Sequence, residues 1–166
     1  MSTSRIAILM GSDSDFPRLE PCIATLKDFG IIPIVRVLSA HRTPVEACNF
    51  ASTARANGIQ TIICAAGGAA HLAGVIAAHT TLPVIGIPLD NPPLGGLDAL
   101  LATVQMPGGV PVATVGVGRG GPVNAALTAL RILSVSDSAI AKQLDDFVVT
   151  QHDRVLDKDA KLQAKI

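Results

Sequence analysis

The chain has 166 residues, which predicts a single domain with a sizeable buried core. Its 13 basic and 13 acidic residues leave no net charge, which argues against nucleic acid or an acidic membrane as a partner, because binding to phosphates needs a surplus of positive charge. Only Asp90 and Asp98 are charged between Ala56 and Gly118. A stretch so poor in charge predicts a buried parallel sheet with flanking helices. It also predicts a subunit interface, so we expect a homo-oligomer.

Short apolar runs alternate with longer segments whose apolar residues recur at helical spacing. The runs predict strands at residues 5–10, 31–39, 61–66, 82–88 and 110–118. The longer segments predict helices at residues 16–30, 43–58, 69–79, 97–106 and 123–133, with a last one from Asp137. Pro21 is unfavourable inside a helix and suggests that the first helix begins late. Thr43 and Pro44 suit the cap and first turn of the second helix.

This alternation predicts an α/β fold, a three-layer, doubly wound parallel sheet of the flavodoxin-like type. The sheet domain is expected over residues 1–136. Residues 137–166 are expected to form a C-terminal helix that packs on the same or a neighbouring subunit. Its apolar stripe consists of Ile140, Leu144, Phe147, Val148 and Val155. In such sheets ligands bind beyond the carboxyl ends of the strands, so the loops there are the candidate site.

The N-terminus and the cysteines indicate a compartment. Residues 1–13 contain one Arg, a short apolar run and no plausible cleavage site, so no signal peptide is expected. Glycines and prolines interrupt the uncharged stretch before a transmembrane helix could form. Cys22, Cys48 and Cys64 are odd in number and show no CxxC spacing, which favours reduced thiols over disulfides or zinc. We therefore expect a cytoplasmic protein without a metal site.

The loop after the first strand reads GSDSD, residues 11–15. Ser12, Ser14 and the backbone N–H groups of this loop could bind an anion at a helix start. The carboxylates of Asp13 and Asp15 would repel a phosphate, so at least one should bind sugar hydroxyls or cap the helix. Simple capping of the helix by Asp13 or Ser14 is an equally good explanation of the loop.

The loop after the second strand reads SAHRTP, residues 39–44. Taken alone, His41 and Arg42 could be an ordinary surface histidine and a solvated charge. Their position at the ligand edge beside Ser39 favours function, because Arg can grip a phosphate with its planar fork and His can exchange a proton near neutral pH. The absence of glycine between residues 31 and 57 indicates a loop that presents side chains.

Glycines mark the loops after the third and fifth strands. Residues 65–74, AAGGAAHLAG, allow close approach of the backbone to a ligand, but no Lys-Ser or Lys-Thr follows, so this is not a nucleoside-triphosphate loop. His71 is equally compatible with packing in the core. His71 and His79 lack a third ligand at a suitable spacing, which argues against a metal. The G-x-G-x-x-G of Gly116, Gly118 and Gly121 is interpreted as turn and packing glycines, since no strand follows it.

Taken together, the segments MGSDSD, SAHRTP, CAAGGAAHLAG, LPVIGIPL and LDALLATVQMPGGVPVATV closely resemble the bacterial N5-carboxyaminoimidazole ribonucleotide mutase family of purine biosynthesis. The resemblance covers about residues 5–133. It implies a flavodoxin-like octamer that isomerises N5-carboxyaminoimidazole ribonucleotide to 4-carboxy-5-aminoimidazole ribonucleotide without a metal or organic cofactor. Ala73 stands where the family commonly has proline, which is expected to loosen the following helix start.

The resemblance also implies roles for individual residues. His41 matches the catalytic histidine, and Arg42, Ser12 and Asp15 match substrate-binding positions. Ser14 and Ser39 fall in the same pocket. The glycine-rich loop beside the transferred carboxyl group matches Gly68, Ala69, Ala70, His71 and Leu72.

Three other functions fit the same fold and remain open. One is an aminoimidazole ribonucleotide carboxylase that uses free CO2, although the GGAAH segment favours the mutase. The second is a flavin-binding module, which would normally stack the flavin on aromatic faces; this chain has no Trp or Tyr and only four Phe. The third is a receiver domain with Asp13 or Asp15 as phosphoacceptor, which leaves His41 and Arg42 without a role.

Overall fold

The computed structural model describes residues 4–166, so the first three residues of the segment tested for a signal peptide lie outside the described part. The chain forms two compact units, one ending at Ala129 and the other running from Leu130 to Ile166. The expected boundary after residue 136 stays a prediction. Among the described residues, no helix is both long enough and apolar enough to cross a membrane.

The first unit contains a five-stranded sheet in which every neighbouring pair of strands is parallel. The strands are β1 (Ile6–Met10), β2 (Ile34–Val37), β3 (Thr61–Gly67), β4 (Val84–Leu89) and β5 (Ala113–Thr114). They lie in the order β2-β1-β3-β4-β5. This order confirms the predicted flavodoxin-like fold. The strand order reverses between β1 and β3: from β1 the chain first adds β2 on one side and then adds β3, β4 and β5 on the other.

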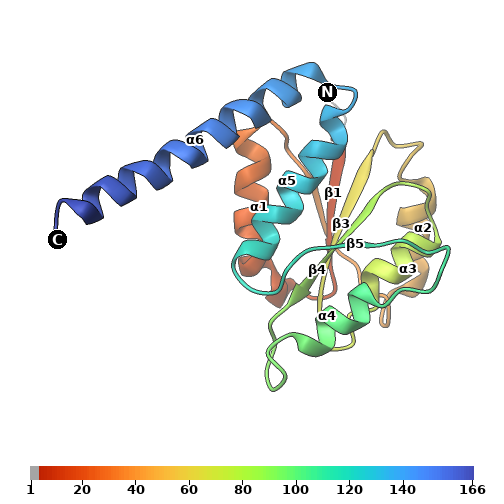
Figure 1. The fold of residues 1–166 in the computed structure, drawn as a ribbon. Coiled ribbons are helices and arrows are strands. Elements are labelled where there is room, and N and C mark those ends of the chain that lie inside the picture. The colour runs from red at the N-terminus through yellow and green to blue at the C-terminus, as the bar shows by residue number, and fades with distance from the viewer. Residues whose placement is uncertain (1–3) are drawn as a thin grey trace. The chain divides into compact units, whose positions relative to one another are not determined.

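Helices cover both faces of this sheet (Figure 1). The helices are η1 (Asp13–Asp15), α1 (Phe16–Asp28), α2 (Pro44–Thr53), α3 (Leu72–Ala78), α4 (Leu97–Val104) and α5 (Gly120–Ser134), the last of which continues into the second unit. In Figure 1, α1 and the start of α5 lie on one face, and α2, α3 and α4 lie on the other. The result is the three-layer arrangement that the alternation of strands and helices predicted.

Small residues allow the helices to pack closely on the sheet. One buried cluster joins β1 and β3 to α2 and α3, and includes Ala7, Leu9, Ala47, Ala51, Ile62, Cys64, Leu72 and Ile76. Burial raises the pKa of the Cys22 thiol to about 12 and also raises that of Cys64, so both stay protonated and pack as small apolar side chains. Ala73 is buried just after the start of α3, so the helix begins at Leu72 without the proline.

The first helix corrects one expectation. It begins at Phe16 and contains Pro21, so the prediction of a late start is wrong. Pro21 removes the N–H that would pair with the carbonyl of Pro17, but both prolines are exposed and water can serve that carbonyl. The carbonyl of Pro21 in turn accepts a hydrogen bond from Oγ1 of Thr25 over 2.8 Å.

The fifth strand is much shorter than the run at residues 110–118 predicted. Only Ala113 and Thr114 pair with β4 as a strand, and Val115 N–H donates to the carbonyl of Gly86. Pro111 has no N–H for a ladder, and Gly118 turns the chain with a φ of +86°. The packing role predicted for the glycines holds at Gly121, where a Cβ would overlap the carbonyl oxygen of Gly116.

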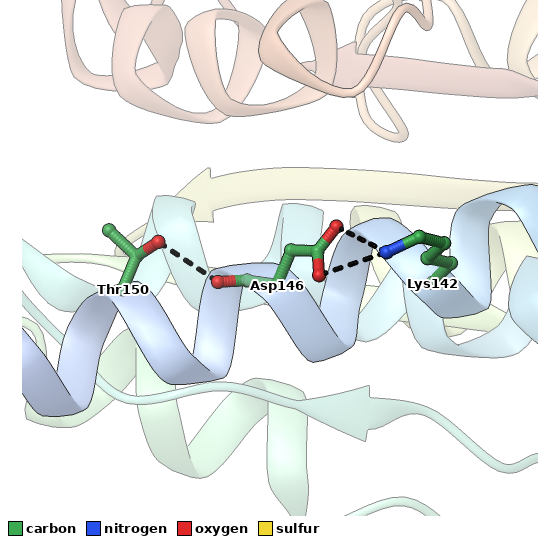
Figure 2. Close-up of polar contacts among 3 residues, drawn as sticks. All are labelled: Lys142, Asp146 and Thr150. Carbon is green, nitrogen blue, oxygen red and sulfur yellow. Dashed lines mark hydrogen bonds and ion pairs between the residues drawn. The ribbon is translucent and has the colours of Figure 1, made fainter.

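The second unit consists of the end of α5 and the long helix α6 (Ser138–Gln163). Asp137 caps α6 by accepting hydrogen bonds from Ala139 N–H and Ile140 N–H. Figure 2 shows a surface ion pair one turn in, where Nζ of Lys142 lies 3.0 Å from Asp146, whose carbonyl accepts from Thr150 Oγ1. This pair stabilises the helix by only about 0.3–0.5 kcal/mol, because both groups are exposed.

The predicted apolar stripe of α6 is buried only at its start. Ile140 and Leu144 are buried, whereas Val148 and Val155 are 54% and 63% exposed. Val149, Leu156 and Leu162 are exposed as well. The last turns of α6 therefore carry exposed apolar side chains.

Candidate active site

The loops that follow β1, β2, β3 and β4 enclose one cavity of about 250 Å³. It lies at the carboxyl ends of the strands, next to the point between β1 and β3 where the strand order reverses. This is where a doubly wound sheet binds its ligands. Its walls are Gly11, Ser12, Ser14, Asp15, Ser39, Ala40, His41, Arg42, Ala66, Gly67, Ala69, His71, Leu72 and Asn91. The fold therefore brings together residues that are 80 positions apart in sequence.

The β1 loop presents two hydroxyl groups to the cavity. Ser12 caps η1 by accepting a hydrogen bond from Ser14 N–H, and Ser14 Oγ donates to Ser12 Oγ over 2.8 Å. Ser12 is thus the cap of η1, whereas the cap position of α1 is Asp15, which makes no side-chain capping bond. The suggestion that Asp13 or Ser14 caps the helix is wrong. Because the loop is tied by its own hydroxyls, both serines are held at the cavity wall.

Asp15 is the last residue of η1 and lines the cavity. Burial raises the pKa of its carboxyl group, and nearby Asp13 acts in the same direction. A hydrogen bond from the backbone at Ser12 and the charges of Arg18 and Arg42 offset part of that rise. Burial thus disfavours the charged form of Asp15, and two neighbouring guanidinium groups partly compensate.

The β2 loop, whose residues His41 and Arg42 line the cavity, is held in shape by Ser39. Ser39 Oγ accepts from the backbone N–H groups of His41 and Arg42, and Ser39 N–H donates to Thr43 Oγ1 over 2.8 Å. Thr43 occupies the cap position of α2 but bonds to Ser39 instead of the helix N–H groups. Nη2 of Arg42 then donates to the carbonyl of Gly11 over 2.7 Å, which joins the β1 and β2 loops.

Two imidazole rings meet at the mouth of the cavity. Nε2 of His41 lies 2.7 Å from Nδ1 of His71, and the rings stand edge to face at 87°. Both rings are exposed, so the alternative of His71 as a core residue is wrong. In an N–H···N hydrogen bond one nitrogen must donate and the other must accept, so this pair holds a single proton between the two rings.

The glycine-rich loop after β3 contributes only part of what the sequence indicated. Ala69, His71 and Leu72 line the cavity, whereas Gly68 and Ala70 do not. Gly68 has a φ of +60°, which turns the chain, and Ala70 is buried at 1% exposure. Gly68 and Ala70 are thus the only two residues predicted to bind substrate that do not line the cavity.

The β4 loop supplies a residue to which sequence analysis gave no role. Asn91 lines the cavity and contacts Gly67 so closely that a Cβ on that glycine would overlap the Asn91 amide. Oδ1 of Asn91 accepts from Nη1 of Arg18 over 2.8 Å. The position of Asn91 just after a strand could have marked it as a site residue. A single Asn in a loop rich in Pro and Gly, however, is not distinctive in the sequence.

Fold and site together define a class. A guanidinium, hydroxyl groups and a histidine pair lie where the strand order of a flavodoxin-like sheet reverses. This combination is typical of a small-molecule enzyme suited to proton transfer on an anionic substrate. The model of the AIR carboxylase family matches residues 5–154. The chain belongs to the AIR carboxylase family.

Relatives and solved structures agree with this assignment. The N5-carboxyaminoimidazole ribonucleotide mutase of Bacillus subtilis is 50% identical over 85% of this chain and 87% of its own length. The phosphoribosylaminoimidazole carboxylase of Saccharomyces cerevisiae is 48% identical over 95% of this chain, which spans only 27% of that longer protein. The crystal structure of Treponema denticola PurE superposes with a TM-score of 0.86 at 30% identity, covering 95% of this chain and 97% of the other.

Proposed function

We propose that this chain is an N5-carboxyaminoimidazole ribonucleotide mutase, which moves a carboxyl group from the exocyclic nitrogen to ring carbon C4 in purine biosynthesis. The relatives with this name in Bacillus subtilis and Mycobacterium tuberculosis are 50% and 48% identical over most of the chain. The observation that carries the proposal is the contact of His41 with His71 at the mouth of a cavity that Arg42 and two serines also line. A proton carrier and an anion anchor are the two groups that such a reaction requires.

The chemistry proceeds in two steps that balance without another reactant. The bond between nitrogen and carboxyl carbon breaks, CO2 leaves, and the nitrogen takes a proton from His41. Ring carbon C4 then attacks the retained CO2, and the C4 proton returns to His41, so substrate and product are isomers. Keeping both fragments in one cavity makes the second step intramolecular, which is worth several kcal/mol (about 7–11 in favourable cases).

The cavity walls suit the parts of the substrate. Arg42, Ser12 and Ser14 line the cavity and offer a cation and hydroxyl groups to the phosphate. Asp15 is an acceptor for the ribose hydroxyls. Ala66, Gly67 and Ala69 form a wall of small residues that leaves room for CO2 and excludes water.

The direct test is conversion of the carbamate substrate by pure, metal-free protein. Wild type should form the C4-carboxylated product, and His41→Asn should retain its fold and lose turnover. Absence of conversion by wild type would refute the mutase function. Rapid conversion by His41→Asn would remove His41 from the mechanism while leaving the function in place.

A second activity has an observation in its favour, since the matching relative in Saccharomyces cerevisiae is named as a carboxylase. That enzyme class would add free CO2 to aminoimidazole ribonucleotide. Supplying this ribonucleotide with CO2 in place of the carbamate distinguishes the two activities. The mutase predicts that turnover with the carbamate is far faster at equal nucleotide concentration.

We also propose that the protein is a cytoplasmic homo-octamer. The charge-poor stretch between Ala56 and Gly118 and exposed apolar side chains support burial between subunits. These side chains include Leu94, Leu97, Leu101 and Val104 in the first unit and Val149, Leu156 and Leu162 in the second. Sedimentation equilibrium should give eight times the chain mass. A mass of one chain would refute the proposed subunit interface.

A further inference from the structure

The β4 loop holds one amide of the cavity wall in a defined position. Nη1 of Arg18 donates to Oδ1 of Asn91 over 2.8 Å and lies 3.0 Å from Oδ1 of Asp90. Arg18 comes from α1, 73 residues earlier in the chain. An ion pair with the residue before Asn91 therefore fixes the guanidinium that contacts the Asn91 amide.

The chemistry of Arg18 decides which way this amide faces. A guanidinium has only N–H donors and no acceptor, so the Asn91 atom that it contacts must be the oxygen. The amide nitrogen consequently faces away from Arg18. It lies against the end of β3, where a Cβ built on Gly67 would overlap Nδ2 of Asn91.

Both N–H groups of this nitrogen remain available at the wall. Within residues 4–166, the Asn91 side chain makes no hydrogen bond other than the one from Arg18. Gly67 and Asn91 both line the cavity, next to Ala66 and Ala69. A neutral donor therefore stands in the wall of small residues, on the β3–β4 side of the cavity.

We propose that Asn91 contacts the substrate, with Nδ2 donating a hydrogen bond to an oxygen of the migrating carboxyl group, and that Arg18 is its positioning residue. This inference rests on the function proposed above. Phosphate is better served by Arg42 and the serines of the β1 loop, which leaves the wall of small residues to the carboxyl group. A neutral amide can follow this group from carboxylate to CO2 and back, whereas a cation would hold the carboxylate ground states too tightly.

The decisive variant is Asn91→Asp, which has almost the same shape but replaces the donor by a negative acceptor. It keeps a partner for Arg18, so the loop should stay in place. We expect the affinity for the C4-carboxylated product to fall about 10-fold or more, and to fall further than in Asn91→Ala, because the new carboxylate repels that of the product. An Asn91→Asp protein that binds product as tightly as wild type would overturn the proposal.

The positioning role of Arg18 is tested by combining substitutions. Arg18→Ala should raise KM in the wild-type background and have no further effect in Asn91→Ala, because it acts through the same amide. Equal losses in both backgrounds would refute this role. All variants are compared at the same pH, because Arg18 also lowers the pKa of Asp15.

Arg119→Ala is the matched control. Arg119 shares a second cavity of about 440 Å³ with Arg18 and Asp90, so its loss removes the same charge from the same region. The activity of Arg119→Ala should equal that of wild type. A loss as large as that of Arg18→Ala would show that the removed positive charge alone causes the effect, and this would overturn the positioning role of Arg18. If Arg18→Ala does not fold, Arg18→Lys replaces it, with a smaller rise in KM expected and an unchanged KM counting against the proposal.

Wild-type turnover separates the two levels of the proposal. If wild type converts the carbamate and Asn91→Asp matches it in KM and product affinity, only the role of Asn91 fails. If wild type does not convert the carbamate, the proposed function fails and the role of Asn91 fails with it. Thermal unfolding of each variant, at one protein concentration, verifies that the fold is retained.

Discussion

Nε2 of His41 and Nδ1 of His71 lie 2.7 Å apart, at the ends of two loops that are 30 residues apart in sequence. The rings stand edge to face, and the hydrogen bond between the two nitrogens contains one proton. Which of the two nitrogens carries that proton depends on the tautomers of the rings, so His41 can act as a donor or as an acceptor at Nε2. The pair thus gives a physical reason for expecting acid–base chemistry at this point of the cavity.

His41→Asn should lower kcat by about 100-fold or more, since general acid–base catalysis contributes in that range. Asn can still occupy the site but cannot accept and return a proton. Steady-state kinetics with the carbamate measure the effect. His79→Asn is the control, because the His79 ring is exposed and its only hydrogen bond among the described residues is to the Val75 carbonyl. A similar loss in both variants would speak against a specific role of His41.

Arg42→Ala should weaken binding of the product by about 10-fold or more, the usual cost of losing a hydrogen bond to a charged group. The substitution removes the proposed phosphate contact and also frees the carbonyl of Gly11. Calorimetric titration with product measures the affinity. Arg36→Ala removes an exposed arginine of β2 that does not line the cavity, and its affinity should not change. Unchanged affinity in Arg42→Ala would refute the phosphate contact.

Asp15→Asn should stabilise the protein at neutral pH while weakening substrate binding. Burial raises the pKa of Asp15, so the folded state holds its proton to a higher pH than the unfolded state does. Stability is therefore lost as pH rises from the ordinary carboxyl pKa through the raised one, and Asn avoids that loss. The thermal midpoints of both proteins should differ at neutral pH and converge as the pH falls below the ordinary pKa. A gain that persists in acid would contradict this account.

Gly86→Ala should destabilise the first unit by about 1–3 kcal/mol, the usual effect of overpacking. A Cβ at this buried position of β4 would overlap Cγ2 of Thr103 and lie 3.1 Å from Cγ1 of Val112. Thr103 cannot easily move, because its hydroxyl donates to the carbonyl of Ala99 over 2.7 Å. Denaturant unfolding at fixed protein concentration measures the difference.

Gly120→Ala is the matched control for that substitution. A Cβ on Gly120, the first residue of α5, would meet no atom within 4 Å. Alanine there should be neutral or slightly stabilising, because it lowers the entropy of the unfolded chain. Equal destabilisation of the two variants would show that close packing at Gly86 is not the cause.

The sequence by itself determined the elements whose causes are local. Apolar runs of β1, β3 and β4 are continuous because both faces of these strands are buried, and this pattern is visible without a structure. Gly30, with a φ of +75°, ends the first helix as its position indicated. The loops of Ser12 and His41 were found as candidates because the rule for doubly wound sheets ties ligand sites to strand ends.

Only the tertiary structure decided how these loops meet. The pairing of His41 with His71 and the hold of Arg18 on Asn91 depend on strand order and loop path, which no window of sequence contains. The same limit explains β5, since pairing along an edge depends on which N–H groups face β4 as well as on apolar character. Local propensity acts over a few residues, whereas a cavity wall forms from groups that become neighbours only after the sheet has assembled.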